Sequence, residues 1–420
     1  MLRLLSHPKY RPFFFSFTAG NFAEGLVAVT VPFVLLQRTG DPAAVGFCLA
    51  LQTAGVLVMA FPGASIADRF PRQKVVSWSY WAAGLALVGI CIALGTDLGT
   101  WAVGAGLFLF GASTAVYGPA SDAMTPRLVS EEYLHKANSM DSLSQRIGQG
   151  ILGPLLGGAM VAMGMGIGAF ALSALLCVFG AIIARRIQLL PPATDNCQQE
   201  EASENSNWAS VLRYLKKTPL LVALLAWVSI FIMLQVGAKP VAATIWITDI
   251  QDGGAALYGI ALSIGAVISA VVVLIIGASP LPSKYLAWMI TAWSLGSGML
   301  MLAVLLPSAW SFIISYALAA GLMAIGNIYW STYIQSTVPD RLLARVISID
   351  WVASLALTPL GAAVAGTVVS QWGAGPTFST AALVPLFSGL GMLTLILRAK
   401  SQGAETRRNS RQELAPDVMD

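Results

Sequence analysis

The stretch GASIADRFPRQK, from Gly63 to Lys74, holds one acid and three bases between two strongly apolar segments. Only 10% of the 420 residues are charged, whereas 56% are hydrophobic. A soluble domain usually carries about 25% charged residues. The stretch is therefore interpreted as a short polar turn between two membrane-spanning helices, and the composition places the whole chain among membrane proteins.

Apolar runs on both sides of this turn set the fold class. A helix needs about 20 apolar residues to cross a bilayer. Twelve such runs follow one another, and the sequence predicts an all-α membrane protein with twelve transmembrane helices. Their approximate spans are 12–36, 43–67, 75–95, 101–125, 139–163, 168–187, 219–241, 257–279, 284–306, 309–334, 346–370 and 376–398. The first run is too long for the apolar part of a signal peptide, so it is expected to stay as a helix.

The basic residues test this helix count. If the N-terminus is cytoplasmic, almost every base outside a helix falls on the cytoplasmic side, and the opposite loops contain only Arg38. Arg146 and Lys239 fall within helices. This asymmetry is typical of multi-pass proteins and explains the net charge of +4 without a nucleic-acid partner. We expect a protein of the cytoplasmic or inner membrane, with both termini in the cytoplasm.

One long polar stretch divides the chain. It predicts an N-terminal six-helix bundle over 1–187, a cytoplasmic linker over 188–218, a C-terminal six-helix bundle over 219–398 and a cytoplasmic tail over 399–420. The segment SVLRYLKK at the end of the linker is either a short amphipathic helix or more linker. The two halves resemble each other, because each contains a segment that joins an apolar helix to a Gly/Pro-rich one. These segments are VYGPASDAMTPRLV in the first half and NIYWSTYIQSTVPDRLLARV in the second. Such repetition favours a transporter whose halves rock against each other.

The opening stretch resembles the signature loop of the major facilitator superfamily (MFS), G-x-x-x-D-R-x-G-R-[RK]. Asp68, Arg69 and Arg72 match, Pro71 replaces the second Gly, and Lys74 follows the last basic position. The resemblance implies the MFS fold and a cytoplasmic gate, in which Asp68 meets the N-terminus of the eleventh helix near Arg345. The alternative is that the loop only anchors the topology.

A second motif lies in the fifth helix. GPLLGG, Gly153 to Gly158, resembles the fifth-helix motif of MFS antiporters through Gly153, Pro154, Gly157 and Gly158. Small residues at this spacing allow two helices to approach closely, and the proline kinks the helix. The resemblance implies export rather than uptake; ordinary helix packing is the alternative. Two further runs resemble the branch of macrolide, multidrug and enterobactin-type siderophore exporters. They are HPKYRPFFFSFTAGNFAEGLVAVTVPFVLL and SVLRYLKKTPLL.

Glu24 is the candidate for proton coupling, because it lies midway along the first helix. A charged group at mid-bilayer costs roughly 2.5–3.5 kcal/mol. A carboxyl there holds a proton more readily than in water and can release it when the cavity is wetted. Asn21 shares its helix face and Arg146 is the nearest internal counter-charge. A purely structural acid is the alternative, and the fourth helix lacks the arginine that related drug exporters carry.

The remaining candidates are polar residues within or beside helices. Asp122, Asp141, Arg345 and Asp350 are expected to form structural or gating pairs, and Lys239 either reaches the headgroups or meets an anionic substrate. Polar and aromatic residues of the predicted central cavity are Gln52, Tyr117, Gln145, Gln149, Trp227, Gln235, Asn327, Tyr329 and Trp330.

These features together predict a monomeric secondary transporter, with the lipid bilayer and a small molecule as its partners. The sequence contains no phosphate-binding loop, and its four cysteines and two histidines show no metal-ligand spacing. We therefore expect no enzyme activity, no cofactor and no metal. The expected energy source is the proton gradient. We expect proton-coupled efflux of amphipathic drugs or antibiotics; siderophore export, uptake and a nontransporting sensor are the alternatives.

Overall fold

The structure is a computed structural model that describes residues 8–122, 124–188, 208–250 and 254–413. Within these ranges the chain is helical and contains no strand. Eleven of the described helices are long and apolar enough to cross a membrane. A twelfth helical pass, from Glu131 to Ala162, is more polar but packs among them. The predicted all-α fold with twelve helices is therefore confirmed, and the chain is a multi-pass membrane protein.

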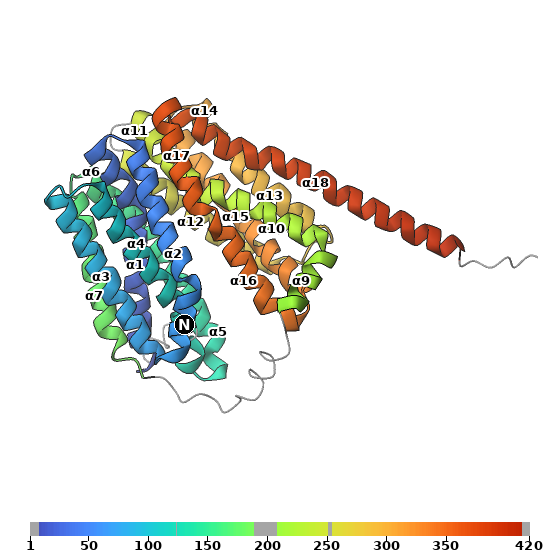
Figure 1. Cartoon of the computed structure of the whole chain (residues 1–420), viewed down its shortest axis with the longest axis horizontal. Helices are drawn as coiled ribbons and strands as arrows, with labels where there is room; N and C mark the ends of the chain where they lie inside the picture. Colours follow the sequence, from blue (N-terminus) through green and yellow to red (C-terminus); the bar gives the residue numbers. More distant parts are fainter. Residues whose placement is uncertain (1–7, 123, 189–207, 251–253, 414–420) are drawn as a thin grey trace, which may run out of the picture.

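The first six passes form one bundle (Figure 1). Their helices are α1 (Tyr10–Thr39), α2 (Pro42–Arg69), α3 (Arg72–Gly95), α4 (Thr100–Asp122), the fifth pass made of α5 (Glu131–Gln145), η3 (Arg146–Leu152) and α6 (Gly153–Ala162), and α7 (Gly166–Ala184). A short turn of 3₁₀-helix, η2 (Thr125–Arg127), precedes α5. Helix α1 packs against α6 and α7, and α4 packs against α2 and α3.

The last six passes form the second bundle (Figure 1). They are the seventh pass of α10 (Pro219–Ile232), η4 (Met233–Ala238) and α11 (Lys239–Ile250), then α12 (Gly254–Ala278), α13 (Tyr285–Met299) with α14 (Met301–Leu305), α15 (Ala309–Thr337), α16 (Asp340–Ala356) with α17 (Thr358–Trp372), and α18 (Ala374–Glu413). Helix α15 packs between α12 and α13.

Local sequence explains where the first helices end. Gly40 adopts a left-handed φ of 62°, and its N–H donates to the carbonyl of Leu36 at 2.8 Å, which closes α1. The Asp41 carboxylate then accepts from the N–H of Ala43 at 2.9 Å, and Pro42 occupies the first turn of α2. Two residues therefore suffice to reverse the chain direction.

The signature loop forms the expected tight turn. Helix α2 ends at Arg69 and α3 begins at Arg72, because the N–H groups of Lys74 and Val75 donate to the carbonyl of Pro71. The turn position is thus confirmed, and the proline starts the next helix without the flexibility of the expected glycine. The Asp68 side chain lies outside the described part of the chain, so the gate between Asp68 and the eleventh pass stays a prediction.

Several predicted helix boundaries were wrong. The fifth pass begins at Glu131 rather than 139, the seventh continues to Ile250 rather than 241, and the eleventh begins at Asp340 rather than near Arg345. The added turns of the fifth and eleventh passes carry polar residues, and backbone hydrogen bonds continue each helix beyond its apolar run. The added residues of the seventh pass, 242–250, are mostly apolar and follow Lys239 and Pro240. Proline explains the eleventh start, because Pro339 precedes the first helical residue.

The segments flanking the C-terminal bundle are also helical. The segment SVLRYLKK lies within α9 (Trp208–Lys217), which confirms the helical alternative. Val211 is fully buried and the Tyr214 hydroxyl donates to the Thr337 carbonyl at 2.9 Å, so α9 is fixed to the end of α15. The rest of the predicted linker, 189–207, lies outside the described residues. Helix α18 continues to Glu413, beyond the predicted end at 398.

Contacts between the two bundles concentrate toward one end of the molecule, where α1 ends and α2 begins. Gly46 of α2 faces Gly366 of α17, with the Gly46 Cα 2.9 Å from the place where a Gly366 Cβ would lie. On the other side Gly158 of α6 faces Ala255 of α12, and Gly259 faces Pro154. We call these six residues the interbundle seam. Figure 1 shows the bundles close together around α2 and α17 and farther apart toward α5 and α9.

Candidate transport site

Glu24 lies at the centre of a hydrogen-bonded cluster in the N-terminal bundle. The hydroxyl of Tyr117, from α4, donates to one carboxylate oxygen. The side-chain amide of Gln149, from η3, donates to the other at 2.8 Å. In the described part of the chain no lysine or arginine forms an ion pair with Glu24. Neutral donors from two other helices therefore hold the carboxylate.

An aromatic layer supports this cluster. The ring of Tyr80, from α3, lies 4.8 Å from the ring of Tyr117, measured between centroids. Tyr80 is buried and packs on Gly20 of α1, where a Cβ would lie only 2.5 Å from its ring. Gly20 therefore gives Tyr80 room one turn before Glu24. Sequence analysis missed Tyr80, because a tyrosine in an apolar helix carries no sign of its distant neighbours.

The two expected partners of Glu24 lie elsewhere. Asn21 is buried against Gly148, and its side-chain nitrogen forms no hydrogen bond. Asn21 shares the helix face of Glu24, but its side-chain nitrogen does not donate to the carboxylate, which accepts from Tyr117 and Gln149. Arg146 begins η3 and is partly buried, but it forms no ion pair within the described ranges. The counter-charge role of Arg146 is not seen in this structure.

This arrangement suits a carboxyl group that changes its protonation state. Hydrogen bonds to an ionised carboxylate are worth about 1.5–3 kcal/mol each, so the two donors stabilise the charged form. Without a fixed cation, no ion pair has to be broken when a proton binds. Hydroxyl and amide groups rotate easily and can accept or donate in either state.

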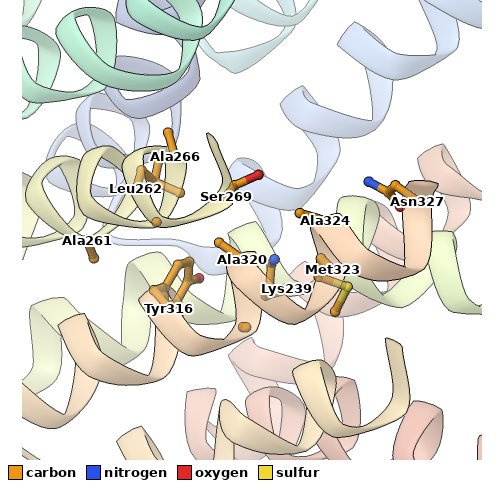
Figure 2. A pocket seen from close by; sticks show the side chains of 12 residues that line it. Lys239, Ala261, Leu262, Ala266, Ser269, Tyr316, Ala320, Met323, Ala324 and Asn327 are labelled. Carbon is orange, nitrogen blue, oxygen red and sulfur yellow. The ribbon is translucent and has the colours of Figure 1, made fainter. Parts of the chain in front are cut away.

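The seventh pass supplies a second polar site in the C-terminal bundle. Lys239 follows the π-helical turn η4, and its Nζ lies 5.4 Å from the ring centroid of Tyr316 in α15. It lines a pocket of about 300 Å³ between α11, α12 and α15, shown in Figure 2. Asn327 and Ser269 line the same pocket. Lys239 therefore lines a pocket, and its two predicted roles, reaching the headgroups or meeting an anionic substrate, stay predictions.

The predicted cavity residues fall into three groups. Tyr117 and Gln149 contact Glu24, and Asn327 lines the pocket. The second group is buried inside the C-terminal bundle and consists of Trp227, Gln235, Tyr329 and Trp330. These four side chains therefore pack in the interior of the C-terminal bundle, and a role in the cavity stays a prediction for them. The third group, Gln52 and Gln145, lies partly buried on α2 and exposed at the end of α5.

Hydrogen bonds explain the burial of the second group. The Trp227 indole donates to the Ser388 hydroxyl at 3.0 Å, and the Gln235 amide donates to the Ala381 carbonyl at 2.7 Å. The Trp227 and Trp330 rings pack against Trp293, with centroids 6.0 and 6.1 Å away. An apolar helix does not reveal which of its aromatic residues face the bundle interior, because each pass is apolar on most sides.

Two of the predicted gate residues accept hydrogen bonds from side chains of their own bundle. Asp141 accepts hydrogen bonds from the Tyr10 hydroxyl at 2.6 Å and from Thr125 at 2.8 Å, which joins α1, η2 and α5. Asp350 accepts one from the Trp330 indole at 3.1 Å. Both contacts fit the structural alternative. Arg345 lies partly buried in α16, and the Asp122 side chain lies outside the described residues.

The GPLLGG motif has two packing faces. Gly153 and Gly157 face α1, where a Cβ on Gly153 would lie 2.6 Å from the Gly25 Cα. Gly158 faces α12 across the seam, and Pro154 follows the π-helical turn η3. The motif therefore packs within its own bundle and against the other bundle. Sequence analysis missed both π-helical turns, which frequently occur at functional sites.

Comparisons with known proteins agree with this architecture. Enterobactin exporter EntS of Citrobacter koseri is 26% identical, covering 99% of this chain and 96% of the relative. EntS of Shigella flexneri is also 26% identical, covering 93% and 91%. Among solved structures, the nucleoside transporter NupG superposes with a TM-score of 0.69 at 14% identity, covering 93% of this chain and 98% of its own.

A further solved structure gives the same result. The POT family transporter PepTSo superposes with a TM-score of 0.72 at 12% identity, covering 94% of this chain and 99% of its own. At such identities the likeness establishes the fold. The sequence pattern of the Major Facilitator Superfamily matches residues 13–349, which is most of the chain. The chain therefore belongs to the Major Facilitator Superfamily and is a membrane transporter rather than an enzyme.

Proposed function

We propose that this transporter exports a small acidic aromatic molecule of the siderophore class, in exchange for protons that bind to Glu24. The observation that carries the coupling is the Glu24 cluster: one carboxylate held by a tyrosine and a glutamine, with no cation paired to it in the described residues. Such a group binds and releases a proton without breaking an ion pair. The GPLLGG motif supports antiport.

Two positive charges support the choice of an acidic substrate. Arg146 in η3 and Lys239 at the start of α11 both lie midway along helical passes, and neither forms an ion pair in the described ranges. Unpaired charges at this depth are costly and usually serve transport. The EntS relatives are named as enterobactin exporters, which favours the same class of ligand.

Alternating access between the bundles provides the mechanism. The bundles meet at the seam and diverge toward the end that carries α5 and α9. The distribution of basic residues assigns that end to the cytoplasm. The conformation is then open to the cytoplasm, where an exporter takes up its substrate. Rocking the bundles would open the seam and close the opposite end.

Drug efflux is the second candidate. Glu24 lies near Tyr117 and Tyr80, and a carboxylate beside aromatic rings suits a cationic amphipathic drug. Uptake of enterobactin and of ethidium into everted membrane vesicles, each with and without a protonophore, separates the two candidates. Proton-driven uptake of enterobactin alone supports the first proposal, uptake of ethidium alone supports the second, and uptake of either compound that ignores the protonophore contradicts coupling.

Glu24→Gln tests the coupling residue. The amide keeps the size and polarity of the side chain but cannot bind a proton, so we expect proton-driven uptake into vesicles to be abolished while the protein stays folded. Asp249→Asn is the matched control, because Asp249 is an exposed acid at the end of the seventh pass, in the other bundle. Wild-type uptake by the Glu24 variant would rule out this role.

A further inference from the structure

The pocket beside Lys239 has a built polar end. The Lys239 ammonium group lies over the ring of Tyr316, a contact that stabilises a cation but neutralises no charge. Within the described ranges no acid forms an ion pair with it. Pro240 follows Lys239, and the π-helical turn η4 precedes it, so the backbone here departs from regular α-helix. The Lys239 ammonium group is therefore placed to bind an anionic group of a ligand.

The other polar groups of the pocket are hydrogen-bond donors. The Trp293 indole donates to the side-chain oxygen of Asn327 at 3.0 Å, which leaves the Asn327 amide nitrogen for a ligand. Ser269 contributes a hydroxyl from α12. Figure 2 shows Lys239, Ser269 and Asn327, from three different helices, around the same space. Donors around a cation are the chemistry that recognises a carboxylate or phenolate.

The remaining lining is apolar and narrow. Small side chains of α12 and α15 and one methionine complete the wall: Ala261, Ala266, Ala320, Ala324 and Met323. The volume of about 300 Å³ lies at the lower end of the range for ligand sites, so it holds one ring rather than a whole large ligand. Walls of alanine methyl groups and a flexible methionine accommodate a flat aromatic group.

The pocket also lies next to the opposite bundle. A Cβ placed on Gly150, in η3, would lie 3.0 Å from the Cβ of Ala266. The turn η3 also carries Gln149, the partner of Glu24. A ligand group held by Lys239 would therefore lie next to the segment that bears the proton-coupling cluster.

We infer that this pocket is the subsite for one deprotonated aromatic acid group of the substrate. Lys239 binds the carboxylate or phenolate oxygen, the Asn327 amide donates a second hydrogen bond, and the alanine-lined walls of α12 and α15 enclose the ring. The inference rests on the proposed export of an acidic aromatic molecule and names the residues that recognise its charge.

Binding of two small probes to the purified, detergent-solubilised protein tests the inference by calorimetry. Salicylate carries the acid and the ring, whereas salicylamide has the same shape without the charge. We expect Lys239→Met to weaken salicylate binding about ten-fold or more, the usual scale for losing a charged hydrogen bond, and to leave salicylamide binding unchanged. Lys239→Arg should retain most of the affinity. Lys284→Met is the matched control, because Lys284 is exposed outside the pocket.

A second variant covers the case in which Lys239→Met fails to fold. Ala320→Phe fills the pocket without changing any charge, and we expect it to abolish the binding of both probes. Equal affinity of wild-type protein and Lys239→Met for salicylate would overturn the inference, and so would the absence of salicylate binding to wild-type protein. Export is measured separately in everted vesicles: binding that depends on Lys239 without proton-driven export would overturn the proposed function alone.

Discussion

At the scale of single residues, the surroundings of Glu24 differ from those of most buried acids. Buried charges usually pair with an opposite charge, and removing one partner of such a pair typically costs about 3–5 kcal/mol. Glu24 is instead held by Tyr117 and Gln149, which lie 93 and 125 positions away in the chain. Its position midway along an apolar helix identified the acid, but no local pattern pointed to these two donors, because only the packing of α1, α4 and η3 brings them together.

Tyr117→Phe tests the contribution of one donor. The substitution removes a hydroxyl but keeps the ring that packs on Tyr80, so we expect the protein to fold normally. Loss of a hydrogen bond to a charged group is expected to slow proton-driven uptake about ten-fold, measured as the initial rate in everted vesicles. Tyr133→Phe, at an exposed tyrosine of α5, provides the control. An unchanged rate for Tyr117→Phe would show that the donor has no part in coupling.

At the scale of elements, glycine sets how closely the passes approach. Gly158 and Gly259 bring α6 and α12 into direct backbone contact, because a side chain at either position would meet a carbonyl oxygen of the other helix. Small residues at the contact are the usual means by which membrane helices pack tightly. The GPLLGG motif predicted close packing, but not that Gly153 and Gly158 would face different bundles.

Gly158→Ala tests this contact. The added methyl group would collide with the backbone of Ala255, which cannot rotate away as a side chain can. Overpacking typically costs about 1–3 kcal/mol, so we expect a lower Tm of the detergent-solubilised protein. Gly89→Ala is the matched control, since no atom lies within 4 Å of its added Cβ and alanine favours the helix. The same Tm for both variants would mean that the seam does not limit packing.

At the scale of the whole molecule, the seam closes one end while the bundles diverge toward the other. Alternating access requires this seam to open in each cycle. The place where a Gly366 Cβ would lie is 3.1 Å from the Cα of Ala43, so cysteines at these positions are close enough to cross-link α2 to α17. The same Cβ would meet the Pro42 carbonyl oxygen at 2.7 Å, so the single Gly366→Cys variant is expected to shift this contact and has to retain transport before oxidation. The fold alone does not show that the seam opens, so the cross-link tests the mechanism directly.

Ala43→Cys combined with Gly366→Cys, in a background whose native cysteines are replaced by alanine, should form a disulfide on oxidation. We expect oxidation to abolish uptake into vesicles and a reductant to restore it, because the closed seam then blocks the outward opening. Each single variant serves as a control for damage by the new side chain. Transport that continues after complete cross-linking would contradict the rocking mechanism.

The sequence by itself determined the fold class, the number of passes and the identity of the acid at position 24. Each of these follows from the cost of placing polar groups in hydrocarbon. Because of that cost, the chain alternates long apolar runs with short charged turns. The signature loop and GPLLGG also led to the family. Helix ends were less accurate, as the early start of the fifth pass at Glu131 shows, because backbone hydrogen bonds extend a helix past its apolar run.

Only the tertiary structure decided which polar residues meet. It assigned Tyr117 and Gln149 to Glu24, left Asn21 outside that cluster, placed Trp227 and Trp330 in the bundle interior and put Lys239 in a pocket. Nearly every side of a transmembrane helix is apolar, so periodicity does not reveal which face turns inward. The π-helical turns η3 and η4 also rotate the side chains that follow them about the helix axis, and the sequence did not predict these turns. Helix packing therefore sets where these side chains point.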